Sequence, residues 1–202
     1  MKFKILIIFI LISLSGYSQS DTPQVKKMFH RVDKGGYFGI NVGATAIDSI
    51  ITGNLGLRFM SVTDRWFSYG LILNGQFSGE ISKDSGPVKY YGGNGGFQIN
   101  PILFPRWTMH LSFPMTFGAG WIGEYSTYNE GISFTGGEFY YLYFEPGVEL
   151  EFNMSHKIRM SFALLYTERF NVQGLSSEVP EILPLALQFH LKFGNFGFID
   201  RY

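Results

Sequence analysis

The stretch WTMHLSFPMTFGAGW, residues 107–121, alternates large apolar side chains with small or polar ones. The even positions hold Thr, His, Ser, Pro and Gly. The odd positions hold the apolar set, namely Trp107, Met109, Leu111, Phe113, Met115, Phe117, Ala119 and Trp121. Successive side chains of a β-strand point to opposite faces, so this period of two predicts a strand with one apolar face and one polar face.

Seven further segments repeat this alternation, namely 36–46, 52–60, 65–77, 87–99, 137–152, 156–170 and 184–194. The segment 87–99 is the poorest match because it contains YYGGNGG, and we expect glycine there to permit sharp curvature. The predicted connections are short at 61–64, 100–106 and 153–155, and longer at 77–86, 122–136 and 171–183, while 47–51 is a short exception. Short turns at one end and longer loops at the other predict an all-β fold, an eight-stranded antiparallel up-and-down transmembrane β-barrel.

The first residues, MKFKILIIFILISLSGYSQS, have the organisation of a secretory signal peptide. Lys2 and Lys4 precede an apolar run, and the small residues Gly16 and Ser18 stand at the −3 and −1 positions of a cleavage site. The apolar run is about half of the ~20 residues that a transmembrane helix requires. We therefore expect a removed signal peptide at 1–18, a periplasmic leader at 19–35 and a barrel at 36–202.

The composition is unusual for a soluble domain, since aromatic residues make up 18% of the chain and charged residues only 16%, against a usual charged share of ~25%. Beyond residue 18 no apolar run is long enough for a transmembrane helix, so strands must carry the apolar surface. Removal of Lys2 and Lys4 reduces the 16 basic residues to 14, against 16 acidic ones. This balance gives no basic surface for nucleic acid. Because the chain has no Cys, we expect neither disulfides nor a lipoprotein anchor.

The volume of the barrel interior decides which face points inward. An eight-stranded barrel is just wide enough for modest side chains. Eight apolar faces like that of 107–121 would bring roughly forty large side chains inside, which do not fit. We therefore predict that the apolar face contacts lipid. A secreted soluble barrel with an apolar interior fails on the same argument.

The polar face is then expected to fill the lumen with a network of polar and charged side chains, namely Arg58, His110, Glu145, Glu149, Glu151, Arg159, Arg169, Gln188, His190 and Lys192. Antiparallel counting through the turn at 153–155 predicts that Glu149 lies near Arg159. The same counting predicts that Arg169 approaches Glu145 or Gln188, and that Lys192 faces the first strand. Opposite charges can pair in a narrow lumen, which lowers the cost of burying them. A proton or ion path is the functional alternative to such a plug.

At this point the chain resembles the small outer-membrane β-barrel families, the OmpX-like and PorT-like barrel domains of Gram-negative bacteria. The resemblance rests on the signal peptide, on the alternating segments from 36 to 194, and on the aromatic-rich end FGNFGFIDRY with its terminal Tyr202. It implies residence in the cell outer membrane, contact with outer-membrane lipid and insertion by the barrel-assembly machinery. It implies no shared activity, because a fold does not carry a function. Trp66, Trp107 and Tyr140 are expected in interfacial aromatic girdles.

Two further functions are weighed against a structural or surface-interaction role. One is a narrow channel for small or apolar molecules. The other is a lipid A-modifying esterase, suggested by His110 and Ser112 followed by Glu124, although Phe113-Pro114 departs from the esterase pattern and the lumen faces away from lipid. No cofactor or metal is expected, since the four His residues are dispersed. An extracellular partner, if one exists, is expected at the longer loops, above all at 124–138, although a plain solvated loop fits the same composition.

Overall fold

The computed structural model describes residues 34–47, 50–83, 86–126, 138–173 and 183–196. The predicted signal peptide, nearly all of the predicted leader and the terminal Tyr202 lie outside these residues. None of the described residues belongs to a helix long and apolar enough to cross a bilayer.

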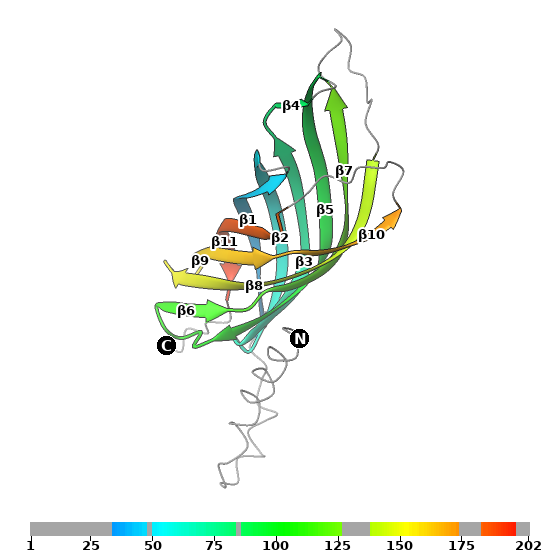
Figure 1. Cartoon of the computed structure of the whole chain (residues 1–202). Helices are drawn as coiled ribbons and strands as arrows, with labels where there is room; N and C mark the ends of the chain where they lie inside the picture. Colours follow the sequence, from blue (N-terminus) through cyan, green and yellow to red (C-terminus); the bar gives the residue numbers. More distant parts are fainter. Residues whose placement is uncertain (1–33, 48–49, 84–85, 127–137, 174–182, 197–202) are drawn as a thin grey trace, which may run out of the picture. The chain divides into compact units, whose positions relative to one another are not determined.

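The described chain forms antiparallel strands that close in a ring (Figure 1). The strands are β1 (Lys34–Ile47), β2 (Ile50–Thr63), β3 (Phe67–Ser78), β4 (Ile81–Lys83), β5 (Gly86–Leu103), β6 (Met109–Ser112), β7 (Met115–Ser126), β8 (Glu138–Asn153), β9 (Ile158–Tyr166), β10 (Glu168–Gln173) and β11 (Leu185–Asn195). Ten strands take part in the ring, whereas β4 pairs only with β5.

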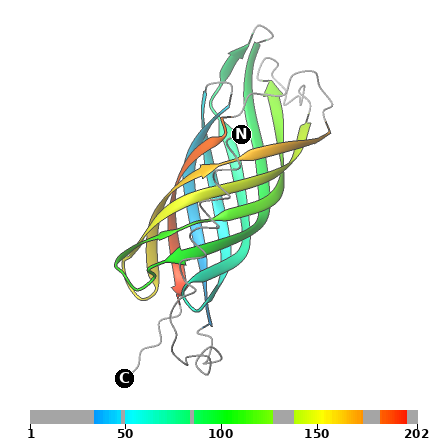
Figure 2. The same cartoon turned by 60° about the horizontal axis from the view of Figure 1, so that its bottom comes forward.

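The ring closes where the last strand meets the first. β11 pairs with β1 from Gly36↔Asn195 to Ala44↔Leu187, and on its other edge it pairs with β9. The predicted position of Lys192 against the first strand is confirmed, because the register places it opposite Gly39. Figure 2 shows the consequence, with β8 and its neighbours crossing in front of β1, β2 and β3.

Two of the predicted strands are interrupted. The segment 107–121 divides into β6 and β7 at Phe113-Pro114, and both parts pair with β5 and β8. Pro114 has no N–H for a ladder bond, but its carbonyl still accepts a hydrogen bond from Gly147 N at 2.8 Å. The segment 156–170 divides into β9 and β10 at Thr167, and both parts pair with β8.

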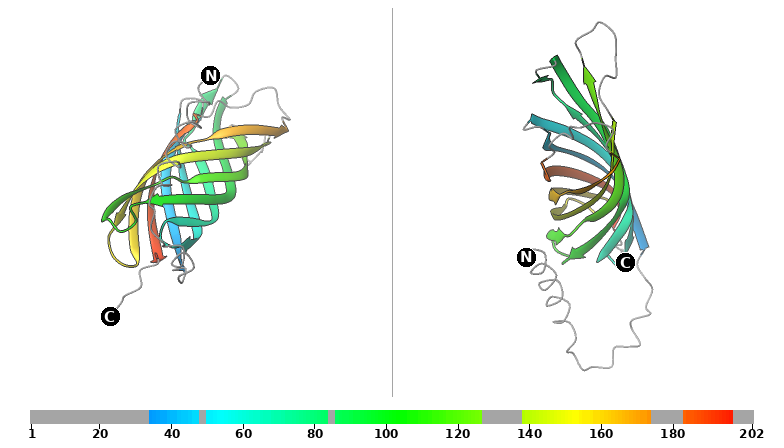
Figure 3. Two further views of the ribbon diagram at one scale, coloured as in Figure 1. Left: turned by 90° about the horizontal axis from the view of Figure 1, so that it is seen from below. Right: turned by 45° about the vertical axis from the view of Figure 1, so that its right-hand side comes forward.

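Three of the predicted connections differ from the structure. The predicted loop at 122–136 begins too early, because β7 continues to Ser126. The sequence predicts a loop at 77–86, but Ile81–Lys83 pairs with the start of β5, so a hairpin stands there (Figure 3, right). The sequence also predicts a turn at 100–106, but β5 continues to Leu103. The Pro101 carbonyl accepts a hydrogen bond from Phe113 N at 2.9 Å, which keeps this proline inside the sheet.

The outer face of the ring is apolar and the inner face is mainly polar. Phe117 is 53% exposed and Leu71 is 60% exposed, although both sit in the middle of regular strands. The neighbouring Thr116 and Ile72 are buried. Glycine allows close approach on the inner face, where Gly96 stands opposite Gly118 and a Cβ on either would meet the other strand's backbone.

Besides a small cluster of Ala163, Leu165 and Ala186, two larger apolar clusters lie inside the ring, and the alternation of the sequence does not predict them. One consists of Val88, Tyr90, Ile122, Tyr141 and Tyr143. The other consists of Tyr37, Met60, Val62 and Phe196. In the second cluster the ring of Phe196 is fully buried, 5.4 Å from Tyr37, with the Arg159 guanidinium 4.0 Å from its centroid. Phe196, the residue after β11, therefore points into the lumen and packs against Tyr37.

Candidate functional site

The lumen contains a cluster of buried charges that strand alternation brings together. Glu149 and Glu151 are two positions apart on β8, so their side chains share the inner face. His190 and Lys192 have the same relation on β11, two strands away around the ring. Arg58 enters from β2. Because these side chains all point into one narrow lumen, they come close to one another across it.

Lys192 occupies the centre of the cluster. Its Nζ lies 2.8 Å from Glu149 Oε1 and 3.1 Å from Glu151 Oε1. All three side chains are buried. Ionised partners at these distances form charge-assisted hydrogen bonds, which are stronger than neutral ones. The ammonium therefore joins the two carboxylates, which would otherwise repel each other.

A guanidinium flanks each carboxylate. Arg58 Nη1 lies 3.8 Å from Glu149 Oε2, and Arg159 Nη1 lies 3.5 Å from Glu151 Oε2. Counting through the predicted turn places Arg159 near Glu149. The actual register places it opposite Asn153, because β8 continues to that residue and the turn lies beyond it. Arg159 is thereby shifted along β8 towards Glu151.

His190 connects Arg58 to Glu149. Its Nδ1 lies 2.5 Å from Glu149 Oε1, and its Nε2 lies 2.9 Å from Arg58 Nη2. A guanidinium can only donate, so Nε2 can accept from Arg58 while the Nδ1–H donates to Glu149. Nε2 also lies 3.0 Å from the side-chain oxygen of Gln188, so the roles of the two ring nitrogens depend on the tautomer.

Serine hydroxyls add further hydrogen bonds to the two carboxylates. Ser112 donates to Glu151 Oε1 at 2.6 Å, and Ser161 donates to Glu149. The predicted lumen residue His110 faces the same carboxylate as Ser112, with Nε2 3.4 Å from Glu151 Oε2. Each carboxylate thus has several donors, as a charge removed from water requires.

A ladder of amides lies beside the charges. Asn41 Nδ2 donates to Asn74 Oδ1 at 2.8 Å, and Asn74 Nδ2 donates to Asn94 Oδ1 at 2.9 Å. Gln98 accepts from Arg58 Nη1 at 3.3 Å, and Gln188 accepts from Arg58 Nη2 at 3.4 Å. The amides therefore join the charge cluster to the walls formed by β1, β3 and β5.

One small cavity lies beside this network among the described residues. The predicted residues Glu145, Arg169 and Gln188 line a common cavity. Its volume is about 10 Å³, enough for no more than about one water molecule. Glu145 accepts a hydrogen bond from Thr167 at 2.7 Å, and the Arg169 guanidinium lies 5.7 Å from the Tyr141 ring.

The residues considered for esterase chemistry do not form a triad. Ser112 is fully buried and donates to the carboxylates of Glu151 and Glu149. Glu124 stands opposite Tyr90, near the far end of β7 from β6. A nucleophile needs its base within hydrogen-bond reach and its substrate alongside, and a buried Ser112 offers no place for a lipid. Within the described ranges, no group of three or more His, Cys, Asp or Glu is arranged to hold a metal ion.

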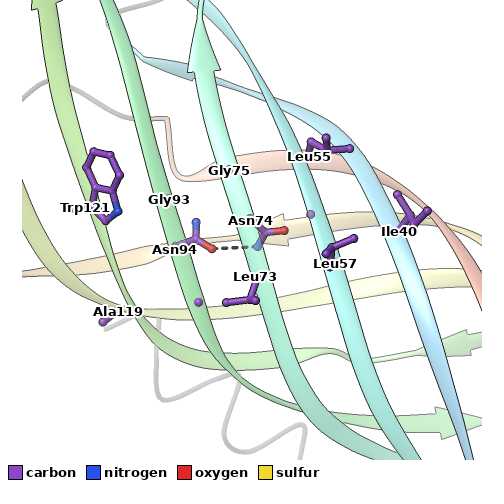
Figure 4. A pocket seen from close by; sticks show the side chains of 12 residues that line it. Ile40, Leu55, Leu57, Leu73, Asn74, Gly75, Gly93, Asn94, Ala119 and Trp121 are labelled. Carbon is purple, nitrogen blue, oxygen red and sulfur yellow. Dashed lines mark hydrogen bonds between the residues drawn. The ribbon is translucent and has the colours of Figure 1, made fainter.

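A second hollow lies on the outer face (Figure 4). It measures about 790 Å³. Small residues of β3, β5 and β7 form its floor, namely Gly75, Gly93, Gly95 and Ala119, while Leu55, Leu57, Leu73 and Trp121 stand around it (Figure 4). This hollow belongs to the apolar outer band.

Comparisons with known proteins identify the fold. No family model matches the sequence, and no curated protein matches it either. The structure of Neisserial surface protein A from Neisseria is similar, with a TM-score of 0.53 and 4% identity, over 80% of this chain and 96% of that one. A major outer membrane protein of Thermus thermophilus has a TM-score of 0.49 and 9% identity, over 79% and 98% of the two chains. Ail, the attachment invasion locus protein of Yersinia pestis, has a TM-score of 0.43 and 12% identity, over 80% and 96%.

At 4% identity, the likeness to Neisserial surface protein A shows the fold alone, that of a small outer-membrane β-barrel. The apolar outer face adds a physical requirement. A closed barrel with exposed Leu, Phe and Val around its wall needs lipid to cover them. The protein is therefore located in the cell outer membrane.

Proposed function

We propose that the protein is an eight-stranded, up-and-down transmembrane barrel with a filled lumen, and that its role is structural or surface-interacting. The strand pairing supports eight positions around the ring. β6 and β7 share one place between β5 and β8, β9 and β10 share the same neighbour β8, and β4 only prolongs the hairpin that leads into β5. An even number of strands is the rule for single-chain bacterial barrels.

The observation that carries this proposal is the buried cluster around Lys192. Its ion pairs join β2, β8, β9 and β11, which lie on different sides of the lumen. A charge is costly to bury unless it is paired and hydrogen-bonded. A network that pairs its charges across the lumen fixes the walls relative to one another and occupies the path that a solute would take.

A narrow channel for small or apolar molecules is less well supported. The cavity beside Glu145 holds about one water molecule, and Phe196 packs with Tyr37, Met60 and Val62 inside the ring. An apolar molecule would also have to pass between the paired charges around Lys192. The buried Ser112 likewise gives no support to a lipid A-modifying esterase.

The surface-interaction part of the proposal is supported by the tall wall of β5 and β7. These strands pair as far as Val88↔Ser126, and β4 extends the same wall (Figure 1). The inner side of this wall carries the apolar cluster of Tyr90 and its neighbours. A packed wall of this kind is a rigid support for binding loops. Most of the loop 124–138 lies outside the described residues, so an extracellular partner there stays a proposal.

The filled lumen predicts the absence of ion conduction. We expect the purified protein, inserted into planar lipid bilayers at high salt, to produce no stable current steps. The same sample should migrate differently on a gel before and after boiling, because an intact barrel resists detergent unfolding. Stable current steps from heat-modifiable protein would contradict the filled lumen while leaving the barrel fold standing. Loss of heat-modifiable migration would contradict the barrel.

A further inference from the structure

Three connections at one end of the barrel repeat one arrangement of side chains. Each has a cation directly before a large apolar residue, namely Arg65-Trp66 after β2, Arg106-Trp107 after β5 and Lys157-Ile158 after β8. The filled lumen does not involve these residues. The pattern therefore calls for a separate explanation.

Hydrogen bonds to backbone carbonyls tie each of the three connections to a neighbouring strand. Trp66 O accepts from Ile102 N at 2.7 Å, which ties the first connection to β5. Trp107 O accepts from Asn153 Nδ2 at 2.7 Å, which ties the second to β8. Lys157 O accepts from Gly194 N at 2.9 Å, which ties the third to β11. The cations are therefore spread along neighbouring parts of one rim.

The tryptophans mark the depth of this rim in the membrane. Trp66 and Trp107 are both exposed, and Phe104 stacks on Trp107 with ring centroids 4.8 Å apart. Amphipathic rings of this kind collect at the level of the lipid headgroups. Arg106, directly before Trp107, is exposed, and so is Lys157 in the connection after β8.

The opposite end has more acidic residues. Those described include Glu80, Glu124 and Glu168, whereas the rim has Asp64 beside its three cations. The cations of the opposite end include Lys83 and Lys89, and Lys89 Nζ lies 3.6 Å from Glu80 Oε2. The combination of cations with exposed tryptophans is thus a property of one rim and not of both ends.

We propose that the rim formed by Arg65, Arg106 and Lys157 binds the phosphodiester headgroups of anionic phospholipids. This inference rests on the proposed membrane barrel, because only an embedded barrel holds the rim at headgroup depth. The planar guanidinium groups of Arg65 and Arg106 can each donate two hydrogen bonds to phosphate oxygens, and the Lys157 ammonium adds a point charge. The neighbouring tryptophans supply the apolar contact for the upper acyl chain, so the site matches a lipid better than a free anion.

Tryptophan quenching by brominated lipids can test this proposal at each end separately. A Trp121→Phe variant keeps only Trp66 and Trp107, at the rim. A Trp66→Phe/Trp107→Phe variant keeps only Trp121, on the other half of the wall. Each variant is reconstituted in phosphatidylcholine that contains a small fraction of brominated phosphatidylglycerol or, for comparison, brominated phosphatidylcholine.

We expect brominated phosphatidylglycerol to associate with the rim tryptophans about two- to five-fold more strongly than brominated phosphatidylcholine at low salt, and equally at Trp121. The preference should vanish in about 0.5 M salt and in Arg106→Gln/Lys157→Gln. The matched control Lys83→Gln/Lys89→Gln, which removes the same charge at the other end, should keep it. Equal quenching by both lipids in heat-modifiable protein overturns the lipid site but not the barrel, whereas protein that is not heat-modifiable overturns the barrel itself.

Discussion

Replacing Lys192 by Met is expected to lower the free energy of unfolding by about 3–5 kcal/mol, the usual cost of removing one partner from a buried ion pair. The ammonium lies within 2.8 Å of Glu149 and 3.1 Å of Glu151. Without it, two buried carboxylates on the same strand face each other with only the flanking guanidinium groups as counter-charges. Urea unfolding in detergent micelles, followed by tryptophan fluorescence, measures the change.

Two control variants separate this effect from a general loss of a charge. Lys89→Met removes an exposed cation whose ion pair with Glu80 spans 3.6 Å at the surface, and we expect a change below about 1 kcal/mol. Adding Glu149→Gln to Lys192→Met removes one of the two carboxylates that have lost the ammonium. The double variant should therefore regain part of the lost stability. If Lys192→Met were as mild as Lys89→Met, or if Glu149→Gln made the double variant worse, the central role of Lys192 would be refuted.

The two-residue period predicted most of the fold because it reports directly on the two environments of the wall. Lipid selects for apolar side chains and the narrow lumen for polar or small ones, so alternation alone distinguished the outward Phe117 from the inward Thr116. The small volume of the lumen then decides which of the two faces points inward. The same logic selected the lumen residues of β2, β8, β9 and β11 by their position on the polar face.

Partners within the lumen were harder to predict, because they depend on strand register and on the ends of strands. The extension of β8 to Asn153 shifted Arg159 from Glu149 to Glu151. The inward orientation of Tyr37 and Phe196 does not follow from the two-residue period, because that period assigns apolar residues to the outer face. An apolar side chain inside the lumen can shield polar groups from water without touching lipid.

Replacing Leu71 by Arg is expected to destabilise the barrel by about 2–4 kcal/mol, because a cation at the bilayer midplane must leave water. Leu71 is 60% exposed, stands near the middle of β3, and pairs with Phe59 and Phe97 on its two sides. On a water-facing surface the same change would stay within about 0.5 kcal/mol. Urea unfolding in lipid vesicles measures the difference between these two environments.

The matched control is Ile51→Arg, at the loop end of β2. Ile51 is 76% exposed on the same outer face, but an arginine there reaches the headgroups, where the cost falls to about 0–1 kcal/mol. The expected result is therefore a large effect at Leu71 and a small one at Ile51, although the two side chains are of similar size and are both exposed. Equal and negligible effects at both positions would mean that water covers the outer face. Equal and large effects would mean that the bilayer lies nearer the loop end, which would leave the rim that carries Arg106 and Trp107 outside the headgroup layer.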